Sequence, residues 1–104
     1  GCVLPAEASG SYVGIIAFRR YTDTVCEMKR LYVTPSGRGL GVGKGLVRSL
    51  IKQARLSGYK EIKLDVLEEF KAARELYREF GFVPSAPITN NPVPGTVFMG
   101  LKLV

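Results

Sequence analysis

The chain has 104 residues, 46% of them hydrophobic, and a formal net charge of +6. This length fits one domain over residues 1–104 with a modest core. No apolar run is long enough to cross a membrane and the first residues lack a signal-peptide pattern, so we expect a cytoplasmic protein. The absence of histidine excludes histidine catalysis, and with only Cys2 and Cys26 as thiols we expect no metal site. The basic balance suits an anionic partner: nucleic acid, a membrane surface or a phosphorylated cofactor.

Three strands are predicted in the first third of the chain, at residues 2–7, 12–18 and 25–33. Gly14 interrupts the second of these, which indicates a bulge or a close backbone approach. In the third, a period of two places Glu27 on the same face as Leu31 and Val33. This strand is not cleanly half-polar, so we expect it to be covered on both sides.

A glycine-rich stretch, RGLGVGKG at residues 38–45, separates the third strand from a helical pattern that runs to about Ser57 and ends at Gly58. The first amides of a helix lack intrahelical partners, and the helix dipole adds positive charge there, so such a turn is an anion site. Arg38 and Lys44 add two full charges. The alternative is a glycine-rich connector without a ligand.

The second half of the chain is predicted to contain a strand, a second helix and two further strands. A fourth strand is predicted at residues 62–67, and Glu68 and Glu69 suit the start of a second helix, which Gly81 ends. A short strand at 82–83, a proline-rich loop at 84–95 and a last strand at 96–104 complete the chain. The order β-β-β-α-β-α-β-β predicts an α/β fold with a mixed, largely antiparallel sheet flanked by two helices.

The spacing of the glycines decides between phosphate ligands. Neither G-x-G-x-x-G nor the P-loop pattern G-x-x-x-x-G-K-[ST] fits residues 38–45 in any register. The pattern [QR]-x-x-G-x-[GA] does fit, and it resembles the pyrophosphate loop of the GCN5-related N-acetyltransferase (GNAT) family. A second block, A-x-x-L-Y-x-x-F-G-F at residues 73–82, is similar to another motif of that family, and the tail at residues 91–99 is similar to one bacterial branch.

The resemblance implies acetyl-CoA as co-substrate, an amine acceptor and direct acetyl transfer. It also implies that the family's usual first strand and first two helices are missing from this chain. The cofactor would bind on the backbone of the third strand and on the glycine loop, at Leu31, Tyr32, Val33, Arg38, Gly39, Gly41, Val42, Gly43 and Lys44.

Two residues match the family's catalytic positions. Glu27 would be the general base, although a strand glutamate that is solvated or paired with Lys29 or Arg30 fits equally well. Tyr77 would protonate the leaving thiolate, from a phenol with a pKa near its ordinary value of about 10. The spacing of Phe70, Ala73, Tyr77 and Phe80 also fits a packed helical stripe. Tyr32 is a second candidate acid that packing explains better.

Two alternatives to an enzyme stay open. One is a truncated remnant of the fold that binds CoA without transferring an acetyl group. The other, a nucleic-acid-binding module, is weaker because Lys and Arg are spread along the chain and no binding motif occurs. Without the segment that precedes this region in the family, a sheet edge at residues 2–7 and one sheet face should be open, so we expect a homodimer.

Overall fold

The computed structural model describes residues 2–8, 10–39, 41–88 and 93–104. Its strands are β1 (Cys2–Ala8), β2 (Ser11–Arg20), β3 (Val25–Val33), β4 (Glu61–Leu67), β5 (Val83–Pro84) and β6 (Thr96–Lys102). Its helices are α1 (Val42–Leu56) and α2 (Lys71–Glu79), and a short 3-10 turn, η1, covers Pro35–Gly37. The predicted order of elements is confirmed.

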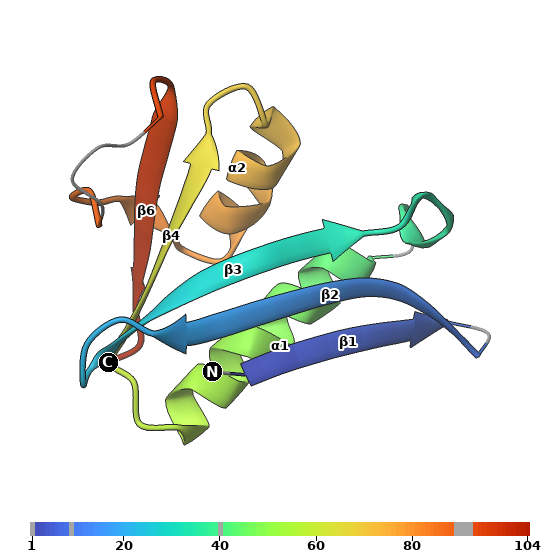
Figure 1. Ribbon diagram of the computed structural model, residues 1–104, viewed down its shortest axis with the longest axis horizontal. Coiled ribbons are helices and arrows are strands. Elements are labelled where there is room, and N and C mark those ends of the chain that lie inside the picture. Colours follow the sequence, from blue (N-terminus) through green and yellow to red (C-terminus); the bar gives the residue numbers. More distant parts are fainter. Residues whose placement is uncertain (1, 9, 40, 89–92) are drawn as a thin grey trace.

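One mixed sheet contains all the strands, in the order β1-β2-β3-β4-β6-β5. Among the described strands only β3 and β4 run parallel to each other, and their pairing covers Val25↔Glu61, Cys26↔Ile62 and Glu27↔Lys63. Beyond these pairs the two strands diverge, so the sheet opens into a V (Figure 1). This split positions the candidate site described below.

Both helices pack on the same face of the sheet. The helix predicted after the glycine-rich stretch is confirmed as α1, and its buried side comprises Leu46, Val47, Leu50, Ile51 and Ala54. These side chains form one core cluster with strand residues such as Ile16 and Ile62 and with Tyr77 of α2. The two helices also touch each other, with the Arg48 guanidinium 5.8 Å from the centre of the Phe80 ring. Among the described elements, no helix covers the other face of the sheet.

Gly14 lies where the backbone of β2 approaches its neighbours closely, as predicted. A Cβ atom at this position would lie 2.9 Å from the carbonyl oxygen of Tyr32 and 3.0 Å from side-chain atoms of Leu46 and Val42. Only glycine allows β2, β3 and the first turn of α1 to approach to this distance.

A shift of register in β3 corrects the predicted alternation. Ile15 pairs with Tyr32 but Ala17 pairs with Lys29, which leaves one extra residue in β3 between these pairs. Before the shift, Cys26 and Met28 belong to the core cluster; after it, Leu31 and Val33 pack against that cluster. Glu27 therefore faces away from the side on which Leu31 and Val33 lie, because a bulge reverses the alternation.

The start of α2 also differs from the prediction. The helix begins at Lys71, because residues 67–70 form a turn in which the Phe70 amide donates to the Leu67 carbonyl over 3.0 Å. Phe70 is the N-cap residue and its side chain is 54% exposed, so it is not part of a packed helical stripe. Residues 89–92, which include part of the family-like tail, lie outside the described residues. No helix in the described part of the chain is long and apolar enough to span a membrane.

Candidate active site

The glycine-rich stretch forms a tight turn at the N-terminus of α1. Gly39 and Gly41 have positive φ angles of 82° and 75°, and Gly41 is the N-cap residue of the helix. The first helical hydrogen bond runs from the Gly45 amide to the Gly41 carbonyl over 3.0 Å. The amides that precede Gly45 at this end therefore lack intrahelical acceptors and are available to an anion.

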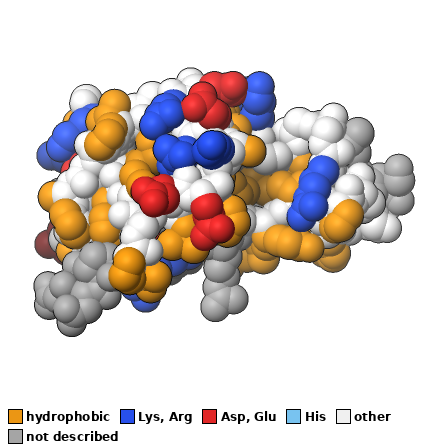
Figure 2. All heavy atoms as spheres, turned by 90° about the horizontal axis from the view of Figure 1, so that it is seen from above, with side chains coloured by type: hydrophobic (Ala, Val, Ile, Leu, Met, Phe, Trp, Pro, Cys, Tyr) orange, Lys and Arg blue, Asp and Glu red, His pale blue; other side chains and the backbone are white. Residues whose placement is uncertain are grey.

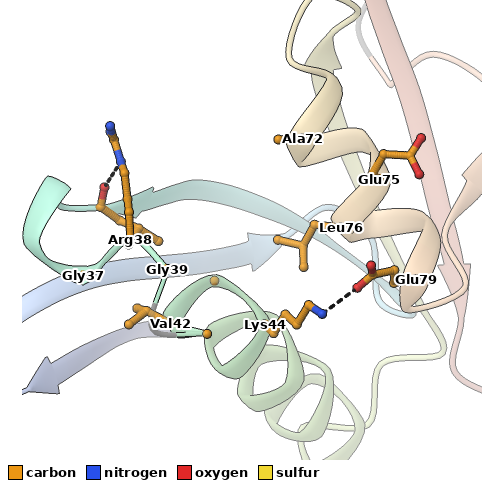
Figure 3. A pocket seen from close by; sticks show the side chains of 12 residues that line it. Gly37, Arg38, Gly39, Val42, Lys44, Ala72, Glu75, Leu76 and Glu79 are labelled. Carbon is orange, nitrogen blue, oxygen red and sulfur yellow. Dashed lines mark hydrogen bonds and ion pairs between the residues drawn. The ribbon is translucent and has the colours of Figure 1, made fainter.

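A cavity of about 470 Å³ lies between this turn and α2. Figure 3 shows the loop residues on one side and Ala72, Leu76 and Glu79 on the other. The predicted cofactor residues that line it are Val33, Arg38, Gly39, Gly41, Val42, Gly43 and Lys44. The turn and the helix start thus bring together residues that the sequence assigned to a pyrophosphate.

Both cations of this loop have partners within the protein. The Lys44 ammonium lies 3.2 Å from Oε2 of Glu79 on α2. Arg38 donates from Nε to the carbonyl oxygen of Val33 over 3.3 Å, and Figure 3 marks both contacts. A phosphate ligand would compete with Glu79 for Lys44.

A larger cavity of about 1180 Å³ occupies the split between β3 and β4. Leu31, Tyr32 and Val33 line one wall, residues of β4 and α2 line the other, and Val33, Arg38 and Ala72 are shared with the smaller cavity. Seen from above, the molecule is hollowed between its two parts, with hydrophobic side chains exposed in the hollow and charged ones around it (Figure 2). Tyr32, which the sequence favoured as a packed residue, lines this cavity and is 53% exposed.

Tyr77 lines the larger cavity from α2. It is only 5% exposed, and its ring lies 5.8 Å from that of Phe82. Burial, with a smaller contribution from the negative charge of Asp65, raises the pKa of Tyr77 to about 12. The expected ordinary pKa is therefore wrong, and the phenol is protonated throughout the physiological range.

Glu27 lies outside both cavity linings, as far as the described residues define them. It is only 2% exposed, and its Oε1 and Oε2 atoms lie 3.0 Å from Arg19 Nε and 2.9 Å from Lys29 Nζ. Glu27 was predicted to be either a general base or a strand glutamate in an ion pair, and this geometry matches the ion pair. Its role as a base stays a prediction, and the structure does not bring it to the same cavity as Tyr77.

Asp65 and Lys29 line the larger cavity, and the sequence reasoning assigned neither of them to the site. Asp65 follows the alternation of β4, where Ile62 and Leu64 are buried and Asp65 is exposed. Asp65 lies just beyond the residues at which β3 and β4 pair, and this position places it at the cavity. The sequence alone does not show that these two strands are neighbours, so Asp65 could not be assigned from it. Among the described residues there is no cluster of three or more His, Cys, Asp or Glu that could hold a metal ion.

Known proteins similar in sequence to this chain include N-acetyltransferases. An uncharacterized N-acetyltransferase of Schizosaccharomyces pombe is 39% identical over 95 residues, which is 90% of this chain and 58% of the relative. N-acetylaspartate synthetase of Xenopus tropicalis is 35% identical over 90% of this chain and 35% of its own length. The chain thus spans between about a third and three fifths of these two curated relatives.

Solved structures show the same fold. A Klebsiella pneumoniae protein described as an acyl-CoA N-acyltransferase superposes with a TM-score of 0.90 and 30% identity, over 98% of this chain and 72% of its own. YncA of Salmonella typhimurium, described as an acetyltransferase and solved with its cofactor acetyl-CoA, gives 0.83 and 27%, over 98% and 64%. The model of the acetyltransferase (GNAT) family matches residues 1–82. The chain therefore belongs to the GNAT acetyltransferase family.

Proposed function

We propose that this chain is the acetyl-CoA-binding part of an N-acetyltransferase that moves an acetyl group directly to an amine. The observation that carries the proposal is the continuity of the two cavities. A helix-start anion site lines the smaller one, a split sheet lines the larger one, and Val33, Arg38 and Ala72 belong to both. The family match and the acetyl-CoA bound to YncA support the same ligand.

In this proposal the pyrophosphate accepts hydrogen bonds from the amides of Val42, Gly43 and Lys44 at the start of α1, and the Lys44 and Arg38 side chains supply charge. The pantetheine arm lies along Leu31, Tyr32 and Val33, where β3 has no partner strand on the β4 side. The amide groups of the pantetheine arm form hydrogen bonds with backbone N–H and C=O groups of β3 that would otherwise bond to water. Arg38, which bonds the Val33 carbonyl, would exchange that acceptor for the cofactor.

The reaction needs a neutral amine nitrogen that attacks the thioester carbon. A C–N bond forms and the C–S bond breaks. The attacking nitrogen gives up one proton and the sulfur gains one, so a neutral amine yields an amide and the CoA thiol. One proton is released beforehand when the acceptor starts as an ammonium ion. The protonated Tyr77 donates a hydrogen bond to the departing sulfur; with a pKa of about 12 it stabilises the thiolate more readily than it surrenders its proton. Glu27 is our sequence-based candidate for the base. Asp65 and Glu69 are the carboxylates that the described cavity lining places with Tyr77.

Three further points belong to the proposal. A homodimer is supported by β1 at the sheet edge, by Val3, which is 61% exposed, and by the sheet face without a described helix. A cytoplasmic location is supported by the two free cysteines, Cys2 and Cys26. Nucleic acid is not proposed as a partner.

Calorimetric titration with acetyl-CoA, followed by a thiol-release assay against a panel of amines, tests the function. Binding with turnover supports the enzyme, whereas binding without turnover on any amine favours a CoA-binding remnant. In the enzyme, Tyr77→Phe should lower kcat about 10- to 100-fold with little change in acetyl-CoA affinity. An unchanged kcat would reduce Tyr77 to a packing residue.

A further inference from the structure

Two opposite charges stand at the mouth of the split between β3 and β4. Glu27↔Lys63 is the last aligned pair of the two strands. Two residues further along each strand, and so on the same face, come Lys29 and Asp65. Both line the larger cavity. A cation and a carboxylate therefore flank the opening from the two diverging strands, on the face opposite the helices.

Lys29, the cation of this pair, is held in place by Glu27 and still has hydrogen-bond donors for a ligand. Lys29 contacts Glu27 at 2.9 Å, and Arg19 contacts the other oxygen of the same carboxylate at 3.0 Å. Two cations around one carboxylate leave a net positive charge. An ammonium group has three donors, so Lys29 can bond Glu27 and still donate to a ligand. Its side chain is 37% exposed, which leaves it accessible.

The carboxylate of the pair is free in the described part of the chain. The ion pairs found there include none that involves Asp65, and none that joins Lys29 to Asp65. Asp65 is exposed, yet close enough to Tyr77 for its charge to disfavour the phenolate. A positively charged amine attracted to Asp65 would thus lie near Tyr77, the residue proposed to donate a hydrogen bond to the departing sulfur.

We propose that the acceptor is an amino acid or a similar small amine with a carboxylate next to its amino group. The amine lies toward Asp65 and the carboxylate binds Lys29. The inference rests on the proposed acetyl transfer, and the product is an N-acetylated carboxylate, CoA and one proton. The cavity, at about 1180 Å³, exceeds the roughly 300–1,000 Å³ typical of ligand sites, so it has room for the acetyl end of the cofactor and a small acceptor.

Acceptors without a carboxylate fit the charges less well. A polyamine would bring a second cation toward Lys29, and the N-terminus of a peptide would bring a neutral amide. Like charges at such a site are unfavourable, and the Lys29 ammonium would lose its charge-assisted hydrogen bond to the acceptor. Arg38, Glu69 and Lys71 also line the cavity, but Lys29 and Asp65 are the charges that the two diverging strands place on either side of the opening, and they favour a zwitterion.

The test compares three matched acceptors: an amino acid, its carboxamide and its decarboxylated amine, for each of the standard amino acids. We expect kcat/KM for the best amino acid to exceed that of its two analogues by about 10- to 100-fold, which is the charge-assisted hydrogen bond expressed as a rate ratio. Transfer to amines without this preference overturns the inference and leaves the proposed function standing. No transfer to any amine overturns both.

Variants locate the preference. In Lys29→Met, KM should rise for the amino acid but not for its two analogues, so that kcat/KM for the amino acid exceeds theirs by no more than about threefold. In Asp65→Asn, KM should rise equally for all three acceptors. Arg19→Met is the matched control: it also removes a cation from Glu27 but lies outside the cavity lining as described, so the preference should remain. A preference that survives Lys29→Met overturns the assignment. If that variant does not fold, wild-type selectivity still decides the substrate class.

Discussion

Lys44 at the start of α1 and Glu79 at the end of α2 form an ion pair across the smaller cavity, with Nζ 3.2 Å from Oε2. The pair joins the two helices, and both residues line the proposed phosphate site (Figure 3). Both side chains are more than half exposed, so the pair contributes little to stability, about 1 kcal/mol or less. Its consequence lies in ligand binding. In the described ion pairs Glu79 contacts Lys44 alone, so its negative charge is not offset by a second cation and would repel a phosphate bound to the same ammonium.

Glu79→Gln should therefore raise the affinity for CoA. Removing the competing carboxylate frees Lys44 and lowers the negative charge near the pyrophosphate, and we expect a gain of about two- to fivefold, the equivalent of about 1 kcal/mol or less. Calorimetry at two salt concentrations measures it, and the gain should shrink at high salt.

Glu75→Gln is the matched control for this effect. Glu75 also lines the smaller cavity, but its partner is Arg78 on the same helix, at 2.9 Å. Its replacement removes the same charge without releasing Lys44. Equal gains from the two variants would attribute the effect to overall charge, and no gain from Glu79→Gln would contradict competition for Lys44.

Gly41→Val should weaken CoA binding by tenfold or more while the fold survives. The φ angle of Gly41 is 75°, a conformation that costs an L-residue roughly 1–2 kcal/mol, so the turn that presents the amides would rearrange. Gly45→Ala is the control, because a Cβ there meets nothing within 4 Å and the residue lies in a regular helix. That variant should gain about 0.5–1 kcal/mol in stability and keep its CoA affinity. Unchanged CoA affinity in a folded Gly41→Val variant would refute the pyrophosphate assignment.

The order of elements could be predicted because local signals determine it. The stripe on α1, the glycines after both helices and the close approach at Gly14 each follow from a few neighbouring residues. The face of Glu27 could not be predicted, because the extra residue in β3 becomes visible only from its pairing with β2.

Contacts between residues far apart in the sequence could not be predicted either. Arg19 contacts Glu27 because β2 and β3 pair as Arg19↔Glu27, and Lys29 and Asp65 face one cavity because β3 neighbours β4. The residue types alone indicated charge, but not which charges meet. For the same reason the raised pKa of Tyr77 could not be foreseen, since it depends on burial by the core and on Asp65.

Glu27→Gln distinguishes a structural role from a catalytic one. The carboxylate is buried between two partly exposed cations, so its loss leaves Arg19 and Lys29 to water and should cost about 1–3 kcal/mol. In a domain of this size that lowers Tm by several degrees, at about 4–8 °C per kcal/mol. Arg19→Gln should cost less, because Lys29 remains. Full stability with turnover lost mainly at low pH would instead identify Glu27 as the base.

Stability should fall steeply at alkaline pH because of two buried acids. Burial raises the pKa of Tyr77 from 10.0 to about 12 and that of the Cys26 thiol from 9.0 to about 11. Between the unfolded and folded values the unfolded chain releases a proton that the folded chain retains, so unfolding becomes easier as pH rises. The Tyr77 contribution is fully present below pH 10 and is lost toward pH 12; a shift of this size corresponds to about 3 kcal/mol.

Urea unfolding between pH 8 and pH 12 measures this loss, with variants that assign it. Tyr77→Phe should flatten the fall above pH 10, because it removes the group that titrates there. Tyr12→Phe is the control, because Tyr12 is 68% exposed and its loss should leave the curve unchanged. Cys26→Ala should flatten the earlier part of the fall, from pH 9 to pH 11. Parallel curves for wild type and Tyr77→Phe would mean that the phenol titrates alike in both states, and that Tyr77 is more open to water than its 5% exposure indicates.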